Sequence, residues 1–446
     1  MKRDNRDFDF TIKTLGPRKI LSPLKLSTKI GDSKANFVDD NERVLYQIDH
    51  KKGEKIYSEK NALEIAGPRE KIYFDPTKVR AAIVTCGGLS PGLNNVIRSI
   101  VYTLWYLYGT RSIFGIKYGY HGFLPEEGHE PIVLTPEVVS DIHNLGGTIL
   151  GTSRGGGDRT EDIVDTLERM NINMLFVIGG DGTQKGARDI TNEIEKRGLK
   201  IAVVGIPKTI DNDLYFVDKT FGFDTAVEKA VEAIQSSHTE AKAAYNGVGL
   251  VKLMGRHSGF IAAHATLATN LVNFVLIPEI PFDLEGPNGF LTHLKNRLLH
   301  KHHAVIVVAE GAGQDLLIKD PKDIEYDESG NIKLKDIGVF LKNKIAEFLK
   351  REGIKHKIIY IDPSYMIRSI PANSSDARLC ARLGQNAVHA AMSGKTGLLV
   401  SQVNNRMVHV PIEYVVEKRK QIDPDGDLWR DVIETTGQPL LMKNEQ

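Results

Sequence analysis

The sequence has little cysteine, almost no net charge and no long hydrophobic run. Its two cysteines, Cys86 and Cys380, show no metal-ligand spacing, which favours a reducing compartment. Lys and Arg number 58 against 57 Asp and Glu, so no global field attracts nucleic acid or an anionic membrane. No apolar stretch reaches the roughly 18 residues of a membrane helix, and residues 1–10 lack the apolar core of a signal peptide. We expect a soluble cytoplasmic protein that binds neither nucleic acid nor membrane.

Strand-like segments that end in glycine recur along most of the chain. Its 446 residues, of which 41% are apolar, can bury a large core. Short β-branched runs precede glycine-rich turns and amphipathic stretches, the pattern of strand, turn and helix. These runs are residues 80–85, 174–178, 201–204, 248–253 and 304–308. The pattern predicts an α/β fold with two Rossmann-like three-layer lobes, whose largely parallel sheets face an active-site cleft.

The same pattern gives the expected domain boundaries. Residues 1–77 are polar and charge-rich with little periodicity, so we assign them to an N-terminal extension. The first lobe is expected at residues 78–225 and the second at residues 226–370. A C-terminal segment, residues 371–446, is expected to return to the lobes and cover them.

The first lobe carries three glycine-rich loops, two of which follow predicted strands. In parallel α/β sheets, ligands bind beyond the carboxyl ends of the strands, where free backbone N–H groups meet anions. Gly87 and Gly88 allow close approach to phosphates, and the guanidinium of Arg154 suits phosphate oxygens. Asp181, within the loop Gly179–Thr183, can hold a Mg²⁺ that bridges phosphates. The alternatives are a tight turn, a solvated arginine and a helix N-cap acid.

The segment Pro207–Asp213 places two carboxylates and a hydroxyl behind a strand. Phosphorylation of a sugar alcohol requires removal of the acceptor proton and balancing of the charge on the transferred group. One of Asp211 and Asp213 can act as the base, and the other can orient water or metal. Taken alone, acids in a turn are more often solvated or capping. The three preceding glycine loops favour the catalytic interpretation.

The second lobe carries further candidate residues after its strands. Arg256, in the segment Met254–Arg256, can neutralise charge that builds on a transferred phosphoryl group; the alternative is a surface ion pair. Glu310 can accept hydrogen bonds from sugar hydroxyls. Tyr365 and Arg368 can contact a sugar phosphate through a phenol and a guanidinium.

These motifs, in this order, resemble the phosphofructokinase family, from about residue 73 to about residue 403. Gly-Gly-Asp-Gly-Thr is shared with NAD kinases and some lipid kinases, whereas Pro-Lys-Thr-Ile-Asp-Asn-Asp together with Met-Gly-Arg is highly specific. The resemblance implies phosphoryl transfer from ATP or pyrophosphate to the 1-hydroxyl of fructose 6-phosphate, with Mg²⁺, by a homodimer or homotetramer. It makes the first lobe the donor lobe and the second the fructose 6-phosphate lobe.

The resemblance also implies roles for the residues that match the family's motifs. The donor nucleotide would be bound by Gly87, Gly88, Arg154, Gly155, Gly179, Gly180, Asp181, Gly182 and Thr183. Asp181 would be the Mg²⁺ ligand, Asp211 the base, supported by Asp213, and Arg256 would stabilise the transition state. The fructose 6-phosphate site would be lined by Thr209, Ile210, Asp211, Met254, Gly255, Arg256, Glu310, Tyr365, Met366, Ile367 and Arg368.

Two positions bear on whether the phosphoryl donor is ATP or pyrophosphate. Pyrophosphate users typically carry a second aspartate at position 182, where its carboxylate would crowd and repel an α-phosphate; Gly182 leaves that space open and favours ATP. Lys208, in contrast, is typical of pyrophosphate users. The branch that resembles plant and trypanosome ATP enzymes combines this glycine with this lysine and has a long N-terminal extension. We therefore expect ATP.

The sugar-phosphate site departs from the compact bacterial pattern. Gly247 stands where those enzymes have an arginine that reaches the sugar phosphate from a neighbouring subunit, and Tyr365 stands where they have histidine. Lys355 or Lys357 can supply the missing positive charge, and nothing in the sequence selects between them. The effector-site residues of the bacterial enzymes do not transfer to this sequence either, so control by nucleotides or phosphoenolpyruvate stays open.

Three alternatives remain beside an ATP-dependent enzyme. The first is a pyrophosphate-dependent enzyme of the same fold. The second is a catalytically silent regulatory subunit, against which the intact Asp181, Asp211, Asp213 and Arg256 argue. The third is a kinase of another acceptor, such as NAD or a lipid, which would not require the segment Pro207–Asp213.

Overall fold

The computed structural model describes residues 8–49, 52–53, 61–320, 322, 324–326 and 332–444. The described residues form two compact units. The first unit comprises residues 8–222 and 369–419, and the second comprises residues 223–368 and 420–444. Within this part of the chain, no helix is long and apolar enough to span a membrane.

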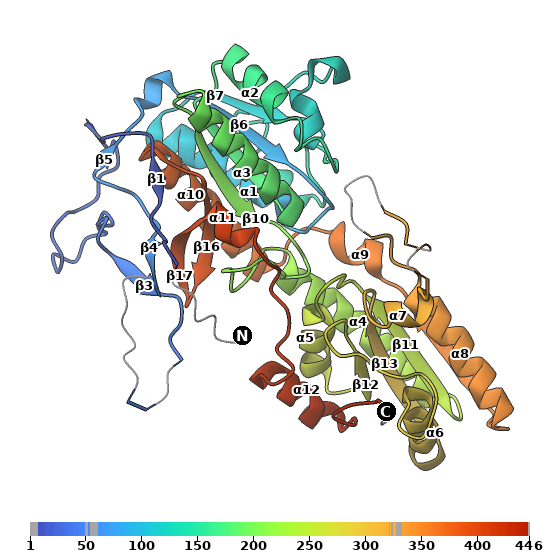
Figure 1. The fold of residues 1–446 in the computed structure, drawn as a ribbon. Coiled ribbons are helices and arrows are strands. Elements are labelled where there is room, and N and C mark those ends of the chain that lie inside the picture. The colour runs from blue at the N-terminus through green and yellow to red at the C-terminus, as the bar shows by residue number, and fades with distance from the viewer. Residues whose placement is uncertain are drawn as a thin grey trace. The chain divides into compact units, whose positions relative to one another are not determined.

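A single large sheet organises the first unit (Figure 1). Its described strands, in spatial order, are β3 (Arg43–Leu45), β4 (Ala62–Ile65), β17 (Arg406–Pro411), β16 (Leu398–Val403), β10 (Ala202–Pro207), β9 (Met174–Gly179), β6 (Arg80–Thr85), β7 (Ser112–Ile116) and β8 (Ile132–Val133). The strands from β16 to β7 are parallel, and antiparallel strands complete both edges. In Figure 1 the red strand β16 lies beside the green strand β10, although about 200 residues separate them in sequence.

Helices cover both faces of this sheet, because its central strands are apolar on both sides. Ala81 and Ile83 of β6 belong to a core shared with α1 (Leu93–Tyr102) and α10 (Ser374–Met392). Ala82 and Val84, on the opposite face of the same strand, belong to a second core. That core is shared with α2 (Thr160–Arg169), α3 (Asp181–Lys196) and the short α11 (Ile412–Val415). Alternate residues of one strand thus build two separate cores, as in a three-layer α/β fold.

The second unit has the same layered construction around an all-parallel sheet. Its described strands, in spatial order, are β12 (Phe274–Leu276), β13 (His303–Ala309), β11 (Gly247–Leu253) and β14 (Lys357–Ile361). One face packs against α6 (Phe290–Lys301) and α8 (Ile337–Arg351), and α4 (Phe223–Ala243) and α5 (Phe260–Thr269) also contact the sheet. The remaining helices are α7 (Gln314–Leu317), α9 (Ser364–Arg368) and α12 (Asp427–Thr436). The predicted α/β class with largely parallel sheets is confirmed.

The described part of the N-terminal extension is built into the first unit. Strands β3 and β4 extend the large sheet beyond β17, and β1 (Lys13–Thr14) pairs with β15 (Lys395–Thr396). A further pair joins β2 (Ile20–Leu21) to β5 (Lys71–Ile72). Phe8 and Phe10 pack edge-on against Phe216 with ring centroids 5.1 and 5.3 Å away. The extension therefore completes the sheet edge and contributes to the core.

A buried ion cluster joins the extension to the strands beside it. The Glu64 carboxylate in β4 accepts hydrogen bonds from Arg69 Nη2 at 2.9 Å, Lys395 Nζ at 2.7 Å and His409 Nδ1 at 2.9 Å. Burial alone would raise the pKa of Glu64, but the contacts from His409 and Lys395 outweigh it and hold that pKa well below its ordinary value. Burial lowers the pKa of His409 to about 4, so its ring is neutral at pH 7. Loss of the Glu64 carboxylate would leave the buried cations Arg69 and Lys395 without this partner.

Acid will destabilise the first unit well before its carboxylates titrate, through two buried histidines: His409 of this cluster and His389 of α10. Burial lowers the pKa of both His389 and His409 to about 4, whereas both rings titrate near 6.5 once unfolded. Between those values the unfolded chain binds protons that the folded chain does not, so stability falls as pH falls from about 6.5 towards 4. We expect the thermal midpoint to drop by about 5–10 °C between pH 7.5 and pH 5.

Differential scanning fluorimetry across this pH range checks the expectation. His409→Gln removes one of the two titrating rings and should flatten the pH dependence, even if it lowers the midpoint at pH 7.5. His300→Gln, at an exposed position of α6, is the matched control and should leave the pH dependence unchanged. An equal pH dependence in all three proteins would remove His409 from the explanation.

Candidate active site

Three loops of the first unit meet at one edge of its sheet. Strands β6, β9 and β10 are parallel neighbours, so the segments that follow them leave the sheet side by side. The backbone N–H of Cys86 donates to Ile178 O at 3.0 Å, and that of Lys208 donates to Gly179 O at 3.0 Å. The loop at Gly87, the start of α3 and the segment after Pro207 are therefore adjacent. The structure brings these predicted loops together.

The fourth predicted loop also packs against this edge. The backbone N–H of Gly87 donates to Ser153 O at 2.8 Å, and the Thr152 hydroxyl donates to Gly87 O at 2.7 Å. These bonds hold the segment that carries Arg154 and Gly155 against the loop at Gly87. Burial and, to a smaller extent, the positive charge of Arg154 lower the pKa of Lys208.

Lys208 is a buried cation among the glycine loops. Its side chain is 5% exposed, and its Nζ donates to Gly88 O at 2.7 Å. Burial lowers its pKa to about 8, so the ammonium remains the major form at pH 7. Gly87 has a φ of +84°, and a Cβ there would lie 3.1 Å from this Nζ. Glycine at position 87 thus provides both the backbone conformation and the space for the ammonium.

Asp181 and Gly182 begin helix α3 directly after β9. Asp181 Oδ2 accepts from Lys185 Nζ at 3.0 Å and from Arg419 Nη2 at 3.1 Å. The Tyr120 hydroxyl donates to Thr183 O at 2.7 Å, and its ring lies where a side chain at position 186 would be. A Cβ at Gly182 would meet no atom within 4 Å. The helix start therefore presents a carboxylate next to open space.

The turn that carries the two remaining carboxylates is held by side-chain hydrogen bonds. Asn212 adopts a left-handed conformation with φ of 54°, and its Oδ1 accepts from the Thr220 N–H at 3.0 Å. The Thr209 hydroxyl accepts from the Asp211 N–H at 3.1 Å and donates to Asp213 Oδ1 at 3.1 Å. Ile210 is 5% exposed and anchors the turn in the protein. The side chains of Asn212 and Thr209 thus hold the turn, and with it the backbone at Asp211, through contacts that do not use the Asp211 side chain.

The second unit brings together Glu310 and the Met-Gly-Arg segment. Strands β11 and β13 pair up to Leu253 and Ala309, and the Glu310 N–H donates to Leu253 O at 2.9 Å. Burial raises the pKa of the Glu310 carboxyl, and the charges of Arg256, Lys252 and Arg368 counteract this. Gly255 has a φ of +133°, and a Cβ there would lie 2.5 Å from Ser258 O. These candidate substrate-binding residues therefore lie together at the ends of the neighbouring strands β11 and β13.

The predicted substrate residues on helix α9 differ in their exposure to solvent. Tyr365 and Met366 are 77% and 72% exposed, whereas Ile367 is fully buried. The Arg368 guanidinium lies 4.9 Å from the Tyr365 ring centroid. Tyr365, Met366 and Arg368 can therefore contact a ligand through side chains, while Ile367 can do so only through its backbone. A Cβ at Gly247 would lie 2.0 Å from Ala241 O, so this fold has no room for an arginine at that position.

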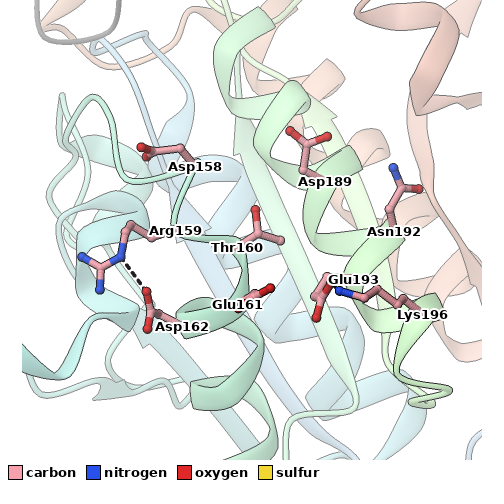
Figure 2. Close-up of a pocket in the computed structure, with 9 residues that line it drawn as sticks. All are labelled: Asp158, Arg159, Thr160, Glu161, Asp162, Asp189, Asn192, Glu193 and Lys196. Atoms are coloured by element: carbon pink, nitrogen blue, oxygen red, sulfur yellow. Dashed lines mark hydrogen bonds and ion pairs between the residues drawn. The ribbon is translucent and has the colours of Figure 1, made fainter.

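A pocket of about 500 Å³ lies between the start of α2 and the outer part of α3 (Figure 2). Acidic side chains predominate among its lining residues, which are Asp158, Arg159, Thr160, Glu161, Asp162, Asp189, Asn192, Glu193 and Lys196. The Arg159 Nε donates to Asp162 Oδ2 at 2.5 Å. Asp158, the last residue of the loop that carries Arg154, is one of these lining residues. Its acidic lining distinguishes it from the glycine loops that suit phosphate.

Two cations of the site were missed by the sequence analysis. Lys185 stands four residues after Asp181 on α3, so helical spacing alone places the two side chains together. Arg419 has no such local signal, because the Asp181 and Asp213 that it contacts lie more than 200 residues earlier in the chain. Lys185 could have been predicted from helical spacing alone. The contacts of Arg419 could be recognised only from the tertiary structure.

Comparisons with known proteins agree with this geometry. Residues 80–391 match the family model of phosphofructokinase. An ATP-dependent 6-phosphofructokinase from Borreliella burgdorferi is 56% identical over 446 residues, 99% of each chain. An ATP-dependent 6-phosphofructokinase of Arabidopsis thaliana chloroplasts is 53% identical over 374 residues, 84% of this chain and 68% of the relative.

Solved structures show the same fold at lower sequence identity. A pyrophosphate-dependent phosphofructokinase from Marinobacter aquaeolei has a TM-score of 0.65 and 22% identity, with 80% of this chain and 91% of that chain covered. Phosphofructokinase from Pichia pastoris has a TM-score of 0.62 and 23% identity over 80% of this chain and 37% of that one. The family match and the relative that spans the full length lead to one conclusion: the chain belongs to the phosphofructokinase family.

Proposed function

We propose that this protein is an ATP-dependent 6-phosphofructokinase. It transfers the γ-phosphoryl group of ATP to the 1-hydroxyl of D-fructose 6-phosphate and releases fructose 1,6-bisphosphate and ADP. The observation that carries the proposal is the meeting of Asp181, Lys208 and the Asp211–Asp213 turn at one sheet edge. A metal ligand, a cation and a base are the groups that phosphoryl transfer to an alcohol requires. The full-length relative named as this enzyme supports the same activity.

The assignment of roles follows the chemistry of each position. Asp211 accepts the proton of the sugar hydroxyl, and the Thr209 contact orients its turn for that step. Arg256 neutralises charge on the phosphoryl group as it moves, and Glu310 accepts hydrogen bonds from sugar hydroxyls. Tyr365 and Arg368 bind the sugar phosphate, with the guanidinium supplying positive charge. Loops Gly87–Gly88, Arg154–Gly155 and Gly179–Thr183 bind the donor through backbone N–H groups.

The residues at Asp181 fit a magnesium ion. Among the described residues, both ion pairs of Asp181 use Oδ2, which leaves Oδ1 for a metal. One carboxylate together with substrate phosphates and water is a common set of ligands for Mg²⁺. When bound, Mg²⁺ supplies charge neutralisation between the donor phosphates. Asp181 is its protein ligand in this proposal, and the homo-oligomer expected from the family resemblance belongs to the proposal as well.

ATP is preferred over pyrophosphate because of the open space at Gly182. An α-phosphate needs room that a side chain at this position would restrict, and no atom lies within 4 Å of a Cβ placed there. Lys208 favours the alternative donor, since a buried ammonium beside the glycine loops can bind a compact pyrophosphate. A pyrophosphate-dependent enzyme is therefore the second candidate function.

The formation of fructose 1,6-bisphosphate, measured in parallel with ATP and with pyrophosphate, tests the proposal. We expect product with ATP and Mg²⁺, and a far lower rate with pyrophosphate. Product with pyrophosphate alone would keep the reaction and the fold but reverse the donor assignment. Product with neither donor would contradict the proposed function and favour a silent regulatory subunit.

A further inference from the structure

Arg419 joins the C-terminal segment to the catalytic turn. Its backbone forms an antiparallel bridge with Leu214, the residue after Asp213. Leu214 is 1% exposed, so the bridge rests on a buried part of the turn. Arg419 is also the last residue of the first unit before the chain continues into the second. The main chain thus fixes Arg419 beside the candidate carboxylates before its side chain is considered.

The guanidinium of Arg419 bridges two carboxylates from different loops. Its Nη1 donates to Asp213 Oδ2 at 2.9 Å, and its Nη2 donates to Asp181 Oδ2 at 3.1 Å. The Asp213 and Asp181 side chains are 5% and 9% exposed, and that of Arg419 is 30% exposed. A planar guanidinium holds its two nitrogens at a fixed separation, so it determines how far apart the two carboxylates lie. A surface ion pair between mobile side chains would not do this.

The other contacts of the two carboxylates divide the roles between them. Asp213 Oδ1 accepts from the Thr209 hydroxyl at 3.1 Å, so both of its oxygens have partners within the protein. Asp181 shares Oδ2 between Lys185 and Arg419. Asp213 is therefore a fixed structural acid, while Asp181 can still offer Oδ1 to a metal. The two cations on Asp181 oppose the approach of a further cation.

We propose that Arg419 is a positioning residue that sets the separation of Asp181 and Asp213 and weakens the binding of a bare divalent cation at Asp181. The metal then binds well only with nucleotide phosphates, whose negative charge offsets the two resident cations. The coupling to nucleotide rests on the proposed function, whereas the effect on bare metal does not. No chemical step is assigned to Arg419 itself.

Binding of Mn²⁺ to the nucleotide-free protein tests this inference without any measurement of activity. The free Mn²⁺ signal in electron paramagnetic resonance gives the dissociation constant. Arg419→Gln should bind Mn²⁺ roughly tenfold more tightly, which is the size of effect that a neighbouring charge has on the proton affinity of a carboxylate. The gain should disappear in Asp181→Asn/Arg419→Gln, because the carboxylate that holds the metal is then absent. Arg406→Gln, an exposed arginine at the start of β17, is the matched control and should bind as the wild type does.

Arg419→Lys separates charge from geometry and protects the test against misfolding of the glutamine variant. An ammonium keeps the positive charge but cannot bridge both carboxylates as a guanidinium does. We expect metal binding closer to the wild type than in Arg419→Gln, together with a kcat reduced by about tenfold and a KM for ATP within about twofold. Wild-type kcat in Arg419→Lys would overturn the positioning role.

The two proposals fail in distinguishable ways. Unchanged Mn²⁺ affinity in a folded Arg419→Gln protein overturns the inference about Arg419, whatever the enzyme's activity. The expected gain in Mn²⁺ affinity, combined with no fructose 1,6-bisphosphate from either donor, supports the effect on bare metal and rejects the proposed function. Circular dichroism and the thermal midpoint establish that each variant is folded.

Discussion

Replacing Asp211 with asparagine will lower kcat by about 10²- to 10⁴-fold, the usual contribution of a positioned general base. An amide has nearly the shape of a carboxylate but cannot take the proton of a sugar hydroxyl. The turn should persist, because the Asp211 N–H and Thr220 hydroxyl hold it through contacts that do not use the Asp211 side chain. ATP affinity should stay within about twofold, since the base acts in the transition state and not in holding nucleotide.

Steady-state kinetics together with calorimetric titration of nucleotide separates the two effects. Asp165→Asn, on the exposed surface of α2 with a side chain that is 61% exposed, is the matched control for the same chemical change. It should leave both kcat and nucleotide affinity unaltered. Near-normal turnover in Asp211→Asn would remove Asp211 from the role of base. A parallel loss of nucleotide affinity would point instead to collapse of the turn.

The strands that carry the site could be predicted from local sequence alone. The runs at residues 80–85 and 174–178 became β6 and β9, because central parallel strands are apolar on both faces and end in glycine turns. The carboxyl ends of parallel strands lie at one edge of a sheet. The glycine loops that follow these strands could therefore be predicted to lie close together. The strands β16 and β17 were missed, although Asn404 and Asn405 mark their hairpin. Both residues have positive φ, at 48° and 61°, as tight hairpin turns require.

The N-terminal extension was harder to interpret, because it folds on partners far away in sequence. Its strands are short, and β4 pairs with β17, more than 300 residues later. Glu64 appears in the sequence as one acid among many. Its contacts with Lys395 and His409 make it part of a buried ion cluster, and only the sheet reveals them. Local periodicity carries no information about such pairings.

The site residues likewise divide into those with a local sequence signal and those whose role depends on distant contacts. Asp181, Lys208 and Asp211 lie within short motifs whose spacing reflects a strand followed by a phosphate-binding loop. Arg419 lies in the basic segment Lys418–Lys420, and each of its neighbours Lys418 and Lys420 packs over an aromatic ring. Nothing in that composition distinguishes Arg419 from a solvated basic residue. Its role as a bridge between two carboxylates depends on tertiary structure.

Replacing Gly182 with aspartate will lower kcat/KM for ATP by at least about a hundredfold, which corresponds to about 2.7 kcal/mol. The substitution introduces a carboxylate where the α-phosphate of ATP is proposed to lie. Two like charges about 4 Å apart repel by about 4 kcal/mol near a protein surface, more than the expected loss. The fold should tolerate the change, since a Cβ at this position meets no atom within 4 Å and an acid is favourable in the first turn of a helix.

Gly182→Ala is the control for this substitution. It separates the effect of the charge and length of the aspartate side chain from the effect of placing any side chain at this position. Its methyl group occupies the same open space, so most ATP activity should remain. Pyrophosphate has no α-phosphate with an attached nucleoside, so any turnover with it should fall less in Gly182→Asp than turnover with ATP does. Unchanged ATP turnover in Gly182→Asp would show that the space at this helix start is not used by the donor. The preference for ATP would then have to arise elsewhere, and Lys208, the buried cation among the same loops, would become the position to vary.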